Sequence, residues 1–149
     1  MAVTNLGYNT VVEYIGDNTI DLDGTAGITA ALFVNTFTFT ATNSALADVV
    51  PATHEVSGSG YVRDILTQTW VNAAGTVTFD TGDATFSATG GSITASDMVV
   101  FDDAVTTPVV DALMFSIDFG ADEVAGDGTD FIVAPHATQG WFQASYVNA

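Results

Sequence analysis

The sequence predicts an all-β protein, an antiparallel β-sandwich of jelly-roll-like type with about eight strands and one or two short helices in its N-terminal half. Most of the chain alternates apolar and polar residues with a period of two and is rich in Val, Ile, Thr and Phe. Clusters of Gly, Asn, Asp and Pro separate these segments at intervals of roughly 8–12 residues. Hydrophobic residues make up 48% of the 149 residues, so we expect a single domain over residues 1–149.

The first half of the chain is predicted to contain both helices. In residues 5–16 the apolar residues stand at loosely helical spacing, which predicts one short helix; they are Leu6, Val11, Val12 and Ile15. A strand is predicted at 27–34. Residues 44–50 start with Ser44, a favourable N-cap, and stop before Pro51, so we expect one or two helical turns there.

The second half is predicted to be strands joined by turns. The expected strands cover 61–71, 75–80, 84–89, 97–102, 110–119, 130–134 and 140–147. The turn signals between them are Asn72 with Gly75, Thr81–Gly82–Asp83, Gly90–Gly91, Pro108, Gly126–Asp127–Gly128 and Gly140.

The charge balance excludes several kinds of partner. One basic residue, Arg63, stands against eighteen acidic residues, for a net charge of −17. Binding to nucleic acid or to an anionic membrane needs clusters of Lys and Arg, so we expect neither. The chain has no cysteine, which excludes disulfides and zinc–thiolate sites. We also expect no secretory signal, because the first residues carry no positive charge and no long apolar stretch.

The acidic segment 117–133 has the composition of either a calcium-binding loop or a turn. An EF-hand loop needs an acidic residue at its third position, but Gly120 or Val124 stands there, depending on whether counting begins at Asp118 or Asp122. Asp and Gly are also strong turn formers. We therefore expect a hairpin loop over 121–128, with a weak calcium site as the alternative.

Other polar motifs have equally simple explanations. Asp21 and Asp23 share one face of an extended segment and are within reach of one ion, but solvated carboxylates are the preferred interpretation. The tetrapeptide at 79–82, Phe-Asp-Thr-Gly, has the form of an aspartic protease loop, yet it occurs once and is followed by Asp83. A turn explains it. His54 and His136 lack metal-site spacing. We expect no catalytic residues, no metal, no cofactor and no enzymatic activity.

Several segments, in chain order, resemble a family of small structural proteins of tailed bacteriophages that includes capsid decoration, or cement, proteins. They are TIDLDG, ITAALFV, HEVSGSGYVRDIL, VTFDTGDATFSATGGSITASDMVVFDD and IDFGADEVAGDGTDFIV. The resemblance implies a β-sandwich module, often a homotrimer, on the outer surface of the virion capsid with the major capsid protein as its partner. The near-total loss of Lys and Arg departs from this pattern, so basic contacts are not carried over.

We expect contacts with the shell, or between copies, at apolar segments near the termini and at the single basic residue. The candidates are Val3, Leu6, Tyr8, Val11, Val12, Arg63, Trp141 and Phe142. Arg63 has a second interpretation, a simple pair with a carboxylate of its own chain. The alternative functions are a receptor- or glycan-binding module of a fibre, and a tail or neck connector. A glycan platform would use Trp70, Trp141, Tyr61 and Tyr146, although aromatic residues on strands are more often core.

Overall fold

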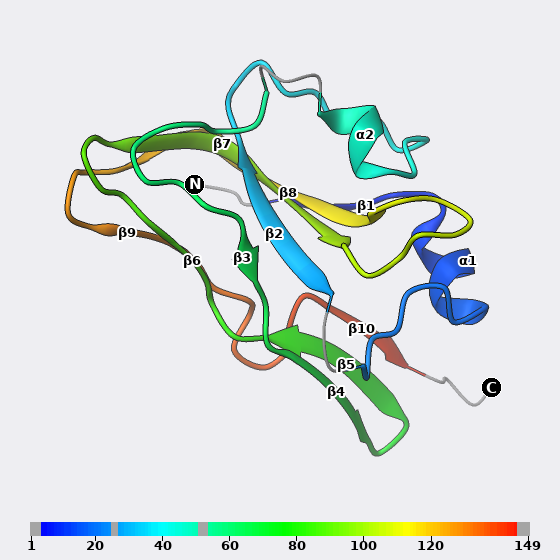
Figure 1. Cartoon of the computed structure of the whole chain (residues 1–149). Helices are drawn as coiled ribbons and strands as arrows, with labels where there is room; N and C mark the ends of the chain where they lie inside the picture. The colour runs from blue at the N-terminus through cyan, green and yellow to red at the C-terminus, as the bar shows by residue number, and fades with distance from the viewer. Residues whose placement is uncertain (1–3, 25–26, 51–53, 146–149) are drawn as a thin grey trace.

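The structure, a computed structural model, describes residues 4–24, 27–50 and 54–145. Its strands form two layers that pack face to face (Figure 1). The larger layer is a five-stranded antiparallel sheet in the order β1–β8–β7–β2–β3. Its strands are β1 (Thr4–Gly7), β2 (Ile28–Phe33), β3 (Asp64–Ile65), β7 (Ile93–Asp102) and β8 (Ala112–Ala125). The predicted all-β, sandwich-like fold is confirmed.

The second layer consists of two small antiparallel sheets. One has the order β10–β5–β4 and the other pairs β6 with β9. These strands are β4 (Gln68–Ala73), β5 (Thr76–Thr81), β6 (Ala84–Ser87), β9 (Asp130–Val133) and β10 (Phe142–Ser145). Only Gly82 and Asp83 separate β5 from β6, so the two small sheets follow one another along the layer.

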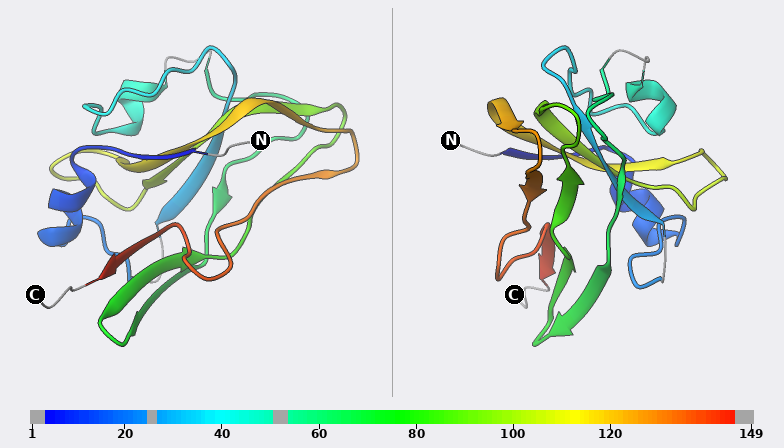
Figure 2. Two further views of the ribbon diagram at one scale, coloured as in Figure 1. Left: turned by 180° about the vertical axis from the view of Figure 1, so that it is seen from behind. Right: turned by 60° about the vertical axis from the view of Figure 1, so that its left-hand side comes forward.

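One side of the sandwich is closed by a crossing segment. The chain leaves the large sheet after β3 and enters the second layer as β4. At the crossing, the Leu66 amide donates to the carbonyl of Ile28 in one layer, and the Thr67 carbonyl accepts from Gly82 of the other. The opposite side is open: β1 is the outer strand of the large sheet there, and β9 and β10 are outer strands of the second layer (Figure 2).

The large sheet is buried on both faces. In β2, Ile28, Ala30 and Leu32 pack into the core between the layers, while Ala31 and Phe33 pack into a second cluster on the other face. The helix α2 (Leu46–Val49) covers this second cluster. All six residues of β2 are therefore buried, which explains why its sequence is almost continuously apolar instead of alternating.

The short helices are confirmed, but their details differ from the prediction. The helix α1 covers Val11–Gly16, whereas Leu6 lies on β1, a strand that the sequence pattern did not predict. Ser44 is not the N-cap of α2, because the helix starts one residue later, after Ala45. The carboxylate of Asp48 accepts the amides of Ser44 and Ala45 at 2.9 and 3.0 Å, and these bonds lower its pKa.

The predicted hairpin loop over 121–128 is wrong. Residues up to Ala125 belong to β8, and the turn covers only Gly126–Thr129, closed by a bond of 3.0 Å from the Thr129 amide to the Gly126 carbonyl. The two flanking strands do not pair with each other, because β9 pairs with β6 and β8 pairs with β7 and β1. The predicted strand at 61–71 also differs: it divides into β3 and β4 where the chain crosses between the layers.

Candidate functional site

An apolar groove of about 410 Å³ lies on the open side of the sandwich, where α1 meets β1, β8 and β10. Three of the predicted contact residues, Val11, Val12 and Phe142, line it although they stand at opposite ends of the chain. Val12 is 77% exposed. The full lining is Asn5, Gly7, Val11, Val12, Ile15, Met114, Phe115 and Phe142. We call this feature the α1 groove.

The helix at this groove is held in place by its buried side. With six residues, α1 is too short to be stable alone, so tertiary packing must fix it. Tyr14 is buried in the core between the layers, and Val11 and Ile15 pack against that core. The amide of Val11 donates to the carbonyl of Tyr8 at 3.2 Å, which sets the start of the helix. Val12 is then left facing solvent.

Phe142 forms the other wall of the groove from strand β10. Its ring stacks on that of Phe79, with centroids 5.2 Å apart, and meets the edge of Trp70 at 6.3 Å. Phe79 is fully buried, whereas Trp70 and Phe142 are half-buried. Such aromatic contacts hold Phe142 in position while part of its ring remains accessible.

Two predicted contact residues are core residues instead. Tyr8 is 1% exposed and packs on Phe39, with ring centroids 4.9 Å apart. Burial and the nearby charge of Asp97 raise the pKa of its hydroxyl. Trp141 is also buried, and its indole N–H donates to the Thr81 hydroxyl at 2.7 Å. Trp141 is buried in the core between the layers, and Tyr8 is buried in the second cluster on the other face of the large sheet, so the prediction that they form an exposed contact is wrong.

The remaining terminal candidates have mixed positions. Leu6 is half-buried on β1, and Val3 lies outside the described residues.

Trp141 links the two layers. Its carbonyl accepts a bond of 2.8 Å from the Asn5 side chain of β1, and its amide donates to the carbonyl of Phe79 in β5. Because Asn5 also lines the α1 groove, the groove lies beside this contact between the two layers.

Arg63 pairs with a carboxylate of its own chain. Its guanidinium forks onto Glu55, with N···O distances of 2.7 and 2.6 Å, and its charged end lies 5.5 Å from the ring centre of Phe101. The Tyr61 hydroxyl donates to the same carboxylate at 3.0 Å and accepts the Leu32 amide at 2.9 Å. Across the described ranges this is the one ion pair. A contact of Arg63 with a neighbouring subunit stays a prediction.

The polar motifs have local structural roles. In the segment 79–82, the Asp80 carboxylate accepts the Thr81 amide, and Thr81 holds the indole of Trp141. His54 bonds to Thr36, and His136 bonds within its own turn. Among the residues that the structure describes, no three His, Asp or Glu side chains are grouped closely enough to hold a metal ion.

The three members of the candidate glycan platform that the structure describes are buried or half-buried. Tyr61 stacks on Phe86 at 5.8 Å, Trp141 is buried, and Trp70 belongs to the cluster with Phe79 and Phe142. Tyr146 lies outside the described residues. Trp141 therefore lies buried beside the cluster of Trp70 and Phe79, whereas Tyr61 belongs to a separate aromatic contact with Phe86.

The sequence pattern missed the floor of the α1 groove, which is formed by Met114 and Phe115 of β8. Both have the pattern of ordinary strand residues, and only the pairing of β1 with β8 brings them beside α1.

Comparison with family models, with curated proteins and with solved structures finds no match to this chain. Within the described ranges, no helix is long and apolar enough to cross a membrane.

Proposed function

We propose that this protein is a non-enzymatic capsid decoration protein of a tailed bacteriophage. It binds the outer surface of the head, self-associates as a homotrimer and stabilises contacts between major capsid subunits. The resemblance to phage structural proteins supports the class. The observation that carries the binding role is the convergence of Val11, Val12 and Phe142 around the α1 groove.

The location of this groove suits docking on a shell. It opens at the side of the sandwich where β1 and β10 are outer strands, and such edges are normally covered or paired in an assembly. An exposed valine beside a half-buried aromatic ring is apolar surface that a partner removes from water. Because the one basic residue of the chain forks onto Glu55, docking through the α1 groove rests on apolar contact and not on a basic side chain of this protein.

Heads assembled with and without the protein test this proposal. We expect heads that lack it to form but to burst at a lower temperature or under milder osmotic shock, and added protein should restore them. Val12→Glu places a charge in the α1 groove and should weaken the rescue. Val110→Glu is the matched control, since Val110 is 59% exposed in the connection between β7 and β8 and should leave the rescue intact.

Equal robustness of heads with and without the protein would overturn the decoration role. Labelling that maps the chain to the tail tip or neck would replace it with the fibre or connector function. Equal rescue by Val12→Glu and by wild-type protein would move the contact surface away from the α1 groove.

A further inference from the structure

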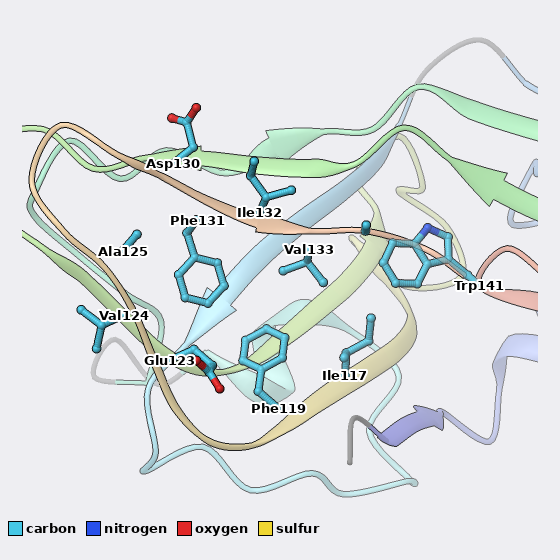
Figure 3. A pocket seen from close by; sticks show the side chains of 11 residues that line it. Ile117, Phe119, Glu123, Val124, Ala125, Asp130, Phe131, Ile132, Val133 and Trp141 are labelled. Carbon is cyan, nitrogen blue, oxygen red and sulfur yellow. The ribbon is translucent and has the colours of Figure 1, made fainter. Parts of the chain in front are cut away.

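A second apolar groove, of about 430 Å³, lies between β8 and β9 (Figure 3). Phe119 and Ile117 of β8 point into it from one side, and Phe131 and Val133 of β9 from the other. The rings of Phe119 and Phe131 are 5.6 Å apart, and Trp141 closes one end. We call it the β9 groove. It shares no lining residue with the α1 groove.

The backbone beside this groove has unused pairing capacity. β9 pairs with β6 along one edge, and its other edge has no partner among the described strands. Figure 2 shows β9 and β10 as the outermost strands of the second layer, on the open side of the sandwich. A strand edge beside an apolar groove is the arrangement that receives an extended peptide: backbone bonds form along the edge and alternate side chains enter the groove.

The rim of the β9 groove combines charge with exposed apolar surface. Glu123 of β8 and Asp130 of β9 both belong to its lining, but Asp130 points away from the side of β9 that carries Phe131 and accepts the Ser87 hydroxyl at 2.7 Å, so Glu123 supplies the charge at the rim. Beside them, Val124 and Ile132 are large apolar side chains that remain exposed. The rim therefore favours a ligand that carries apolar groups together with positive charge.

We propose that the β9 groove binds an extended, basic segment of another protein. The segment pairs with the free edge of β9, packs alternate apolar side chains against the outer surface of the Phe119–Phe131 pair, and directs Lys or Arg toward Glu123. A second copy of this chain does not fit this description, because its single basic residue, Arg63, forks onto Glu55. This inference deepens the proposed function. It rests on that function only in assigning the basic segment to a protein of the phage head.

A synthetic peptide tests the charge and the pairing together. The probe is a fluorescent peptide of alternating Val and Thr with Lys at both ends, titrated with the full chain and followed by anisotropy. We expect saturable binding that weakens with salt, and a peptide with Glu in place of Lys should bind at least about tenfold more weakly. Hydrogen exchange should slow at the β9 amides that point away from β6, because these amides gain bonds to the peptide.

Three variants localise the binding. Ala134→Trp fills the mouth of the groove from an exposed position and should abolish binding. Glu123→Gln should weaken binding about two- to fivefold, as expected for one exposed charge pair. Glu13→Gln removes the same charge from α1, outside both the β9 groove and its rim, and should leave the affinity unchanged.

The inference is overturned if the two peptides bind equally well or neither binds, if Ala134→Trp retains full affinity, or if β9 gains no protection from exchange. These results do not depend on phage heads. If the peptide binds as expected but heads are equally robust without the protein, the decoration function fails while the groove assignment stands. If heads need the protein and the peptide does not bind, the decoration function stands and the assignment of the β9 groove fails.

Discussion

At the scale of single residues, Gly140 fixes how β10 meets β5. Its backbone has a φ of +58°, in the left-handed region that favours glycine. A Cβ atom added here would run into the backbone carbonyl of Phe79. The next residue, Trp141, donates its amide to that same carbonyl at 2.9 Å and its indole N–H to Thr81. The close approach at Gly140 is thus what allows Trp141 to join the two layers.

Gly140→Ala should therefore destabilise the protein by about 1–3 kcal/mol, from backbone strain and the displaced carbonyl. Urea denaturation followed by tryptophan fluorescence measures the change. Gly126→Ala is the control, because Gly126 has no strained φ and open space around its Cβ position. Similar midpoints for the two variants would show that the approach at Gly140 is not a structural requirement.

Asp97 is a half-buried carboxylate on β7 that faces Asp118 of β8 in the sheet register. Burial raises the pKa of Asp97, and the charge of Asp118 raises it further, although a bond of 2.6 Å from the Ser96 hydroxyl opposes the shift. The carboxyl group of Asp97 therefore binds its proton more tightly in the folded state than in the unfolded chain. The stabilisation from Asp97 is fully present below the ordinary aspartate pKa of about 3.9 and is lost as pH rises through the raised folded value.

Asp97→Asn should consequently stabilise the protein at neutral pH, with a gain that shrinks as the pH falls toward the ordinary aspartate pKa. The asparagine carbonyl can still accept the Ser96 hydroxyl. Urea midpoints measured from pH 4 to pH 8 check this. Asp83→Asn, in the exposed turn after β5, separates the local effect from general relief of charge repulsion. A loss of stability at neutral pH would contradict the prediction.

At the scale of elements, the hairpin between β4 and β5 extends from the body of the sandwich (Figure 1). Ala73 pairs with Thr76, so Ala74 and Gly75 form a two-residue turn, with φ of +52° and +81°. Positive φ at both positions is characteristic of a type I′ turn, which favours Asn-Gly. Alanine at the first position is therefore strained.

Ala74→Asn should stabilise the hairpin by about 0.5–1 kcal/mol, because asparagine adopts the left-handed conformation at lower cost. Ala74→Val should have the opposite effect, since β-branched residues strongly disfavour positive φ. Urea denaturation of both variants reports the sign. If both lower the midpoint, a contact of the Ala74 side chain matters more than its backbone conformation.

At the scale of the whole molecule, charge repulsion opposes folding. The net charge is −17, and the described residues contain one ion pair, between Arg63 and Glu55. Other carboxylates accept hydrogen bonds from uncharged donors, such as the Ser44 and Ala45 amides that donate to Asp48 and the Thr85 amide that donates to Asp64. Screening shortens the range of this repulsion to about 10 Å at 0.1 M salt and to about 3 Å at 1 M.

Stability should therefore rise with salt. We expect the urea midpoint to be higher near seawater ionic strength than at low salt, because the compact state gains more from screening than the unfolded chain. Urea is the appropriate denaturant because it is uncharged. A midpoint that stays constant or falls with sodium chloride would indicate that the acids are too dispersed to affect the fold.

The class of fold could be predicted from the sequence alone, because strand periodicity and turn composition are local properties of the chain. The sequence pattern predicted both helices and nearly all strands. It also identified Val11, Val12 and Phe142, apolar residues near the two ends of the chain that line the α1 groove. It did not predict β1 or the long β8. β1 has four residues without clear alternation and is a strand only because β8 pairs with it.

Which apolar residues are core and which remain accessible could not be predicted from the sequence and follows from the three-dimensional packing. Tyr8 and Val12 are equally apolar in a local pattern, yet one is buried under Phe39 and the other faces solvent beside the α1 groove. The sequence pattern likewise did not predict the β9 groove, because it predicted a hairpin between β8 and β9, the strands that border the groove. Burial depends on which segments pack together across the chain, and a pattern that repeats every two residues carries no information about such distant partners.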